Sequence, residues 1–210
     1  MNKILTIAAS VLALASCASN PYEAINVIPK PVEVEVKCSK FTLDSKTVLV
    51  DSSKEELATA AYFNGKILSS CGYALATSNV ADGASTSISF VINPDLDIEA
   101  EGYTLSVKPK KVVITGVDSN GLFFGMQTLL QLFPPVVETC DGAAEKLQAK
   151  CVEIKDWPAF HYRGMHLDPC RHFESIEFVK KQLDVMAMSK FTKMHWHLTE
   201  DQGWRLENKS

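Results

Sequence analysis

Residues 163–198 predict a strand, a helix and a second strand in close succession, and this pattern restricts the possible folds more than any other feature of the chain. Met165 and Leu167 share one side of the first predicted strand, and Ser175 is a suitable N-cap for the helix that follows. Such a segment forms a right-handed βαβ unit with parallel strands. Because parallel sheets are covered on both faces, one βαβ unit cannot be a complete fold.

Charged and polar side chains gather just after each of the two predicted strands. They are Asp168, Arg171 and His172 after the first strand, and Glu200, Asp201, Gln202 and Trp204 after the second. In α/β folds functional groups collect beyond the carboxyl ends of parallel strands, so we expect both groups on the same rim. Arginine and carboxylates can bind neighbouring sugar hydroxyls, and an indole ring can cover an apolar sugar face. The pattern therefore favours a sugar site.

Two other interpretations of these residues stay open. Arg171 could simply form a structural ion pair with Asp168 or Glu200. His195 and His197 point to the same face of the second strand, and a His-x-His pair at a strand end could bind the metal of a metal-dependent barrel hydrolase. They could equally be interior residues hydrogen-bonded to their neighbours. We favour the second interpretation for the histidines, and expect neither a bound metal nor a cofactor.

The first 17 residues predict a targeting segment, with Lys3 followed by an apolar stretch at 4–14. The small residues before Cys17 resemble the lipobox of bacterial lipoproteins, whose cysteine is lipidated and becomes the new N-terminus. A secretory signal cleaved near Ala18 is the alternative. Lipidation would make residues 18–24 a tether and anchor the protein in the cell envelope without spanning the membrane. The absence of aspartate after Cys17 favours the outer membrane.

The composition is that of a globular protein, with 46% hydrophobic and 22% charged residues among 210. A net charge of −4 without an extended Lys/Arg run argues against a nucleic-acid partner. The six cysteines are irregularly spaced and form no metal-binding motif, so we expect most of them to be free thiols.

Residues 25–155 alternate predicted strands and helices, as in one α+β domain. The predicted strands are 32–36, 47–50, 86–92, 102–108 and 111–116, with the last two forming a hairpin. One helix begins after 51–53 and ends at Gly72, and another begins at Asp118 and stops before Pro134. The predicted apolar stripe of the first helix is Leu57, Ala60, Ala61 and Leu68. The polar segment 141–150 is predicted to be a loop.

At residues 162–173 and 195–205 the sequence resembles the opening of the catalytic barrel in family 20 glycoside hydrolases, the β-N-acetylhexosaminidases. Residues 27–31 and 121–132 are similar to the accessory domain of that family. The resemblance implies an α+β accessory domain at 25–155, followed at 156–210 by the first βαβ unit of an incomplete (β/α)8 TIM barrel.

The resemblance also implies an activity: removal of terminal N-acetylglucosamine or N-acetylgalactosamine from glycans with retention, the substrate's own acetamido oxygen being the nucleophile. By position, Arg171 corresponds to the arginine that binds sugar hydroxyls. Glu200 corresponds to a carboxylate of the same site that is usually aspartate. The Asp-Glu pair of the family is expected beyond Ser210, because Glu200 and Asp201 belong to the second strand's motif.

A complete barrel of this type needs about 250 residues. We therefore expect the 210-residue chain to be a truncated fragment that is inactive by itself. The alternative that the sequence leaves open is a non-catalytic module that binds glycans or another protein.

Overall fold

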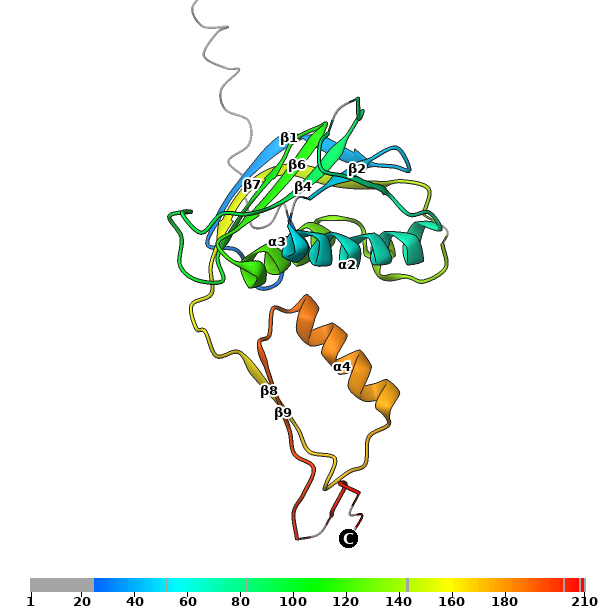
Figure 1. Cartoon of the computed structure of the whole chain (residues 1–210), viewed down its shortest axis with the longest axis vertical. Coiled ribbons are helices and arrows are strands. Elements are labelled where there is room, and N and C mark those ends of the chain that lie inside the picture. Colours follow the sequence, from blue (N-terminus) through cyan, green and yellow to red (C-terminus); the bar gives the residue numbers. More distant parts are fainter. Residues whose placement is uncertain are drawn as a thin grey trace, which may run out of the picture.

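The computed structural model describes residues 25–51, 53–81, 83–142, 144–201, 203–207 and 209. Cys17, the predicted lipidation site, lies outside these residues. Within them the chain forms a seven-stranded sheet with two long helices, followed by two parallel strands joined by a third helix (Figure 1). None of the helices in the described ranges is long and apolar enough to cross a bilayer.

The seven-stranded sheet is mixed and has the strand order β1-β7-β5-β6-β4-β2-β3. Its strands are β1 (Glu33–Leu43), β2 (Val48–Val50), β3 (Ala76–Ser78), β4 (Ser87–Ile92), β5 (Tyr103–Val107), β6 (Lys111–Gly116) and β7 (Leu147–Asp156). β5 and β6 form the predicted antiparallel hairpin, and β7 inserts between β5 and β1. The other half of the sheet is parallel: β6 pairs with β4, β4 with β2, and β2 with β3.

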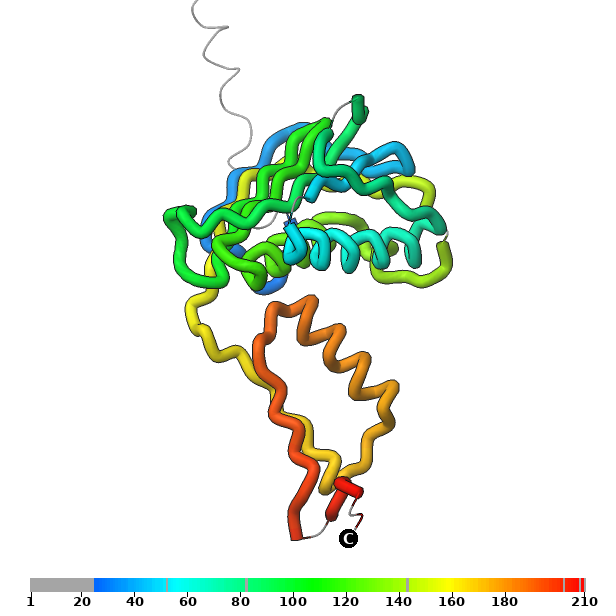
Figure 2. Tube along the Cα trace, viewed as in Figure 1, coloured from blue at the N-terminus to red at the C-terminus, as the bar shows by residue number. Residues whose placement is uncertain are grey.

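Two helices, α2 (Lys54–Cys71) and α3 (Ser119–Leu132), cover one face of this sheet (Figures 1 and 2). Their ends follow the predicted signals. Ser53 caps α2 and exchanges hydrogen bonds with Glu56, and Gly72 ends the helix in the left-handed region at φ 75°. The Asp118 carboxylate accepts the N–H of Gly121 at the start of α3, and the short 3-10 helix η2 (Pro135–Glu138) follows its end.

Two predictions for this unit are wrong. Leu57, Ala61 and Leu68 are exposed, and only Ala60 of the predicted stripe is buried. The buried face of α2 is centred instead on Phe63 and Ile67, which belong to the core between the helices and the sheet. The predicted loop 141–150 contains the start of β7, where Leu147 and Ala149 are buried. Pairing with β1, more than 100 residues away in the sequence, makes this polar stretch a strand.

The second unit is the predicted βαβ unit. β8 (Gly164–Leu167) and β9 (Lys193–Trp196) are parallel, and α4 (Ile176–Met188) connects them, with Ser175 as its N-cap. Only Val179 and Met186 of α4 are buried. Apolar side chains such as Ile176 and Leu183 stay exposed, as expected for one βαβ unit alone.

Lys190 connects the two units through a buried ion pair. It follows α4 in the left-handed region at φ 60°, and its Nζ lies 2.9 Å from Asp156 Oδ2 and 2.8 Å from the Tyr103 hydroxyl. The exposed fractions of the Lys190 and Asp156 side chains are 7% and 11%. Burial lowers the pKa of Lys190, while the negative charge of Asp156 opposes that shift. The ion pair thus joins the end of α4 to β5 and β7.

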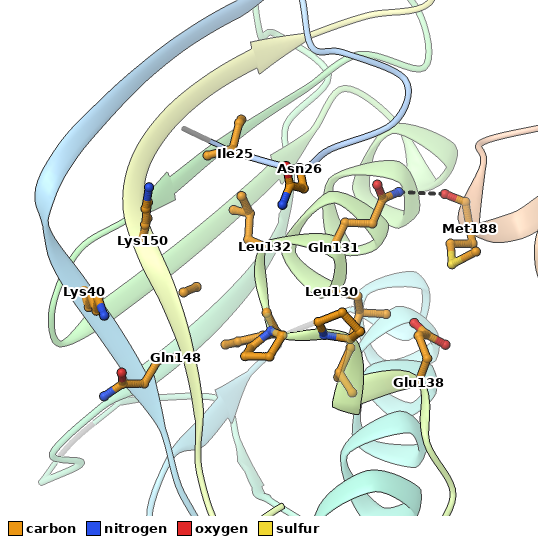
Figure 3. Close-up of a pocket in the computed structure, with 15 residues that line it drawn as sticks. Ile25, Asn26, Lys40, Leu130, Gln131, Leu132, Glu138, Gln148, Lys150 and Met188 are labelled. Atoms are coloured by element: carbon orange, nitrogen blue, oxygen red, sulfur yellow. Dashed lines mark hydrogen bonds between the residues drawn. The ribbon is translucent and has the colours of Figure 1, made fainter. Parts of the chain in front are cut away.

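Two further side chains hold the units together. Arg163, just before β8, pairs with Glu101 (Nη1 to Oε2, 2.9 Å) and donates from Nε to the Lys190 carbonyl at 2.7 Å. The Gln131 side-chain amide of α3 donates 2.9 Å hydrogen bonds to the carbonyl of Ile28 and to that of Met188, and Figure 3 shows the bond to Met188. Gln131 also lines a pocket of about 600 Å³ that extends to β1 and β7. None of the residues lining this pocket belongs to the strand-end groups described next.

Candidate functional site

The loop after β8 is shaped by Asp168. Its Oδ1 accepts hydrogen bonds from the backbone N–H groups of Cys170 at 3.1 Å and Arg171 at 3.3 Å. A short carboxylate that binds the backbone two and three residues ahead stabilises a tight turn. This turn lies directly after the strand, and Arg171 within it faces Glu200 in the loop after β9.

The loop after β9 is a small hairpin that packs against the first loop. The N–H of Glu200 donates to the Gly203 carbonyl at 2.8 Å, and the Arg205 N–H donates to the Leu198 carbonyl at 2.9 Å. Arg205 also reaches across, donating from Nε to the Pro169 carbonyl at 2.9 Å. A Cβ at Gly203 would lie 2.4 Å from the Cys170 carbonyl oxygen, so the close contact between the loops requires glycine.

Arg171 and two carboxylates meet between these loops. The Arg171 Nε lies 3.5 Å from Asp168 Oδ2 and 3.6 Å from Glu200 Oε1. Both distances exceed those of good hydrogen bonds, so the contacts are purely electrostatic. The Arg171 side chain is 68% exposed whereas that of Glu200 is 15% exposed. Glu200 Oε1 is buried and has no hydrogen-bond partner within the described residues. The cluster therefore combines a solvent-exposed donor, the Arg171 guanidinium, with an acceptor, Glu200 Oε1, that can take a further hydrogen bond.

The surroundings of Asp168 lower its pKa. Desolvation raises its pKa, but the Arg171 N–H, the nearby His197 and Arg171, and the Cys170 N–H together outweigh that effect and lower it. Asp168 is consequently ionised at neutral pH and acts only as an acceptor. Its place in the turn suits it to positioning Arg171 rather than to donating a proton.

The histidines lie on the same face as Asp168. His166 Nδ1 is 3.1 Å from His195 Nδ1, and His197 Nδ1 is 3.6 Å from Asp168 Oδ2. His195 and His197 were predicted only as a pair, and His166 was not among the candidate residues. The available signal was its position two residues before Asp168, which places both on the same side of an extended segment.

Trp204 is exposed on the second loop, where it forms an isolated bridge with Thr199. Asp201, next to Glu200, is also exposed. Gln202, another residue of the predicted strand-end group, lies outside the described residues. The expected common rim is confirmed for Arg171 and Glu200, while their role in binding a substrate stays a prediction.

Comparison with known proteins identifies the family. Residues 24–157 match the model of glycosyl hydrolase family 20, domain 2, and residues 160–210 match the model of the glycosyl hydrolase family 20 catalytic domain. The chain belongs to glycosyl hydrolase family 20. The predicted fold is thereby confirmed: an accessory α+β domain followed by the start of the family 20 barrel.

Individual family 20 relatives agree with this assignment. A β-hexosaminidase from Porphyromonas gingivalis is 40% identical over 89% of this chain and 24% of its own length. One from Vibrio furnissii is 37% identical over 89% of the chain and 28% of its own length. The chain therefore spans about a quarter of these curated relatives.

Solved structures of the family superpose on most of the chain. The family 20 β-N-acetylhexosaminidase from Streptomyces coelicolor A3(2) has a TM-score of 0.79 and 31% identity, covering 89% of this chain and 37% of that structure. The family 20 exo-β-N-acetylglucosaminidase from Vibrio harveyi, solved with N-acetylglucosamine, has a TM-score of 0.76 and 33% identity, covering 92% and 28%.

Proposed function

We propose that this chain forms the N-terminal part of a β-N-acetylhexosaminidase and that Arg171 binds the hydroxyls of a terminal N-acetylhexosamine. The observation that carries the proposal is the pairing of an exposed Arg171 guanidinium with the unsatisfied Oε1 of Glu200. A sugar with neighbouring hydroxyls offers both the acceptor and the donor that this pair lacks. Family membership and a relative solved with N-acetylglucosamine support that substrate class.

In this proposal the residues of the chain orient the sugar and do not break the bond. The guanidinium donates to two neighbouring hydroxyl oxygens, and one of those hydroxyls donates to Glu200 Oε1. Ionised Asp168 holds the guanidinium at the rim. In a retaining, substrate-assisted reaction the acetamido oxygen attacks the anomeric carbon while an acid protonates the leaving oxygen. The 210 residues contain no Asp followed directly by Glu. We therefore propose that the chain alone binds the sugar without hydrolysing it.

Ligand-observed NMR with methyl β-N-acetylglucosaminide tests the binding site. We expect Arg171→Ala to weaken binding by about tenfold or more, because hydrogen bonds to charged groups contribute about 1.5–3 kcal/mol each. Arg171→Lys should also bind more weakly, since an ammonium group cannot form the paired hydrogen bonds. Lys181→Ala on the exposed surface of α4 is the matched control and should bind as the parent chain does.

Two outcomes would contradict this proposal. If the folded Arg171→Ala variant binds the sugar as tightly as the parent chain does, the sugar binds at another place on the chain. Turnover of a chromogenic N-acetylglucosaminide that persists through purification and disappears in Arg171→Ala would show that the chain contains the catalytic groups itself.

We also propose that Cys17 carries a lipid that anchors the protein in the cell envelope. The apolar stretch and the small residues before Cys17 support this localisation. Cys17→Ser should move the protein from the membrane pellet to the soluble fraction and abolish labelling with a radioactive fatty acid. A secreted protein cleaved near Ala18 would show the same distribution with and without the substitution.

A further inference from the structure

We propose that His166, Asp168 and His197 form a binding site for a divalent transition-metal ion, with zinc the best match and His195 beside it. This site would be a property of the first βαβ unit, and it shares Asp168 with the candidate sugar site. It differs from a metal-dependent hydrolase that uses His195 and His197, because its ligands come from both strands and no hydrolytic role is assigned to the ion.

Strand register brings the ligands together. In the parallel pair of β8 and β9, His166 lies directly opposite His195. Side chains two residues apart on an extended segment point to the same side, so Asp168 and His197 join them on that face. One ligand atom from each of His166, Asp168 and His197 lies within 4.8 Å of the others.

The donor set and spacing fit a small ion. Zinc binds histidine nitrogen at about 2.0–2.1 Å and carboxylate oxygen at about 2.0–2.2 Å, so tetrahedral ligand atoms are about 3.3–3.6 Å apart. His197 Nδ1 and Asp168 Oδ2 are already 3.6 Å apart. The remaining separations are at most 4.8 Å, so the ligand atoms would have to approach one another by up to about 1.5 Å to bind zinc. Two imidazoles with one carboxylate are also the ligand set of open zinc sites, which retain a position for water.

The crowding of the imidazoles favours an ion over hydrogen bonds alone. The ring centroid of His166 is 4.5 Å from that of His195 and 5.7 Å from that of His197. Without an ion, the 3.1 Å contact between His166 Nδ1 and His195 Nδ1 requires opposite tautomers at the two facing nitrogens. An ion accepts lone pairs from neutral imidazoles directly, and the exposed position of His166 gives it access from solvent.

The positive charge of Arg171 disfavours the binding of a cation at this site. Its Nε lies 3.5 Å from the same Asp168 oxygen that faces His197. The Arg171 side chain is mostly exposed and can swing into solvent, whereas Asp168 is held in its turn by two backbone N–H groups. Removing this positive charge with Arg171→Ala should therefore strengthen metal binding severalfold, the opposite of its expected effect on sugar binding.

Titration of the full chain with Co²⁺, followed by displacement with Zn²⁺, tests the site. We expect one ion per chain, with visible bands typical of nitrogen and oxygen ligands, and at least tenfold weaker binding in His166→Ala and His197→Ala. His166→Gln, which keeps a polar side chain without an imidazole, should be weakened equally. His161→Ala removes a histidine outside the cluster and should bind as the parent chain does.

Circular dichroism of the metal-free variants confirms that each is folded before titration. A thiolate-to-cobalt charge-transfer band would assign the ion to cysteine and overturn the proposal. Binding that survives both His166→Gln and His197→Ala would overturn it too, as would no binding at micromolar Co²⁺ or Zn²⁺. In those cases the histidines are hydrogen-bonded residues of the strand face.

Discussion

Replacing Lys190 with methionine should destabilise the protein more than removing any exposed lysine. Methionine has a similar length and fills the same space, but it leaves Asp156 without its cation. Removal of one partner of a buried ion pair costs about 3–5 kcal/mol, because the other charge stays buried without compensation. Asp156 keeps the Tyr103 hydroxyl at 2.8 Å and the Val32 N–H at 3.1 Å as donors. We therefore expect the low end, about 3 kcal/mol.

Lys66→Met is the matched control. Lys66 pairs with Glu138 at 2.7 Å, but the side chains are 29% and 37% exposed. Pairs in contact with solvent contribute about 0–1 kcal/mol. The two lysines thus differ mainly in burial. Urea unfolding monitored by circular dichroism measures both variants, and the difference in unfolding free energy should be about 2 kcal/mol or more.

A double variant tests the cause of the loss. Asp156→Asn removes the negative charge, keeps a side-chain oxygen for the Val32 N–H and turns an amide N–H toward the Tyr103 hydroxyl, which can accept it. If the uncompensated charge is responsible, Lys190→Met with Asp156→Asn should recover at least half of the lost stability. The reasoning is refuted if Lys190→Met costs no more than Lys66→Met, or if the double variant is less stable than Lys190→Met alone.

The structure predicts the effects of three other substitutions. Gly203→Ala should weaken sugar binding, because its Cβ would lie 2.4 Å from the Cys170 carbonyl oxygen. Gly65→Ala has no atom within 4 Å of its Cβ and should leave sugar binding unchanged. In urea unfolding it should stabilise the protein by about 1 kcal/mol, because alanine favours the helix α2 more than glycine does. Burial and the charge of Asp156 raise the pKa of Tyr103 well above 10, so its proton stays on the folded protein when the unfolded chain has lost it. Stability should therefore fall as the pH rises above about 10, and Tyr103→Phe should reduce that slope by up to about 1.4 kcal/mol per pH unit.

The helix ends could be predicted from sequence because their signals are local. Gly72 closes α2 in the left-handed region, and the carboxylate of Asp118 caps α3 three residues ahead. Such contacts depend only on residues close in the chain. The βαβ unit was predictable for the same reason: its helix and both strands lie within residues 163–198.

Contacts between distant segments explain what could not be predicted. Leu147 begins a strand because β1 lies beside it, and its polar neighbours gave no sign of that partner. His166 became part of the candidate site through the register that places it opposite His195. Register depends on how two strands align, and the sequence of either strand alone does not specify it. The common rim of Arg171 and Glu200 was predictable because each residue follows the end of a predicted parallel strand, while the role in sugar binding that the family motif implies stays a prediction.

The ion pair of Lys190 also has a consequence for the order in which the two units fold during synthesis. Tyr103 and Asp156 are synthesised before Lys190, and N-terminal units generally fold first. The Tyr103 hydroxyl and the Asp156 carboxylate, which accept hydrogen bonds from the Lys190 ammonium group, are then in place when α4 leaves the ribosome. The chain turns at Lys190, with φ 60°, against a surface that already exists. In this order of events the seven-stranded unit is a template on which the first barrel crossover closes.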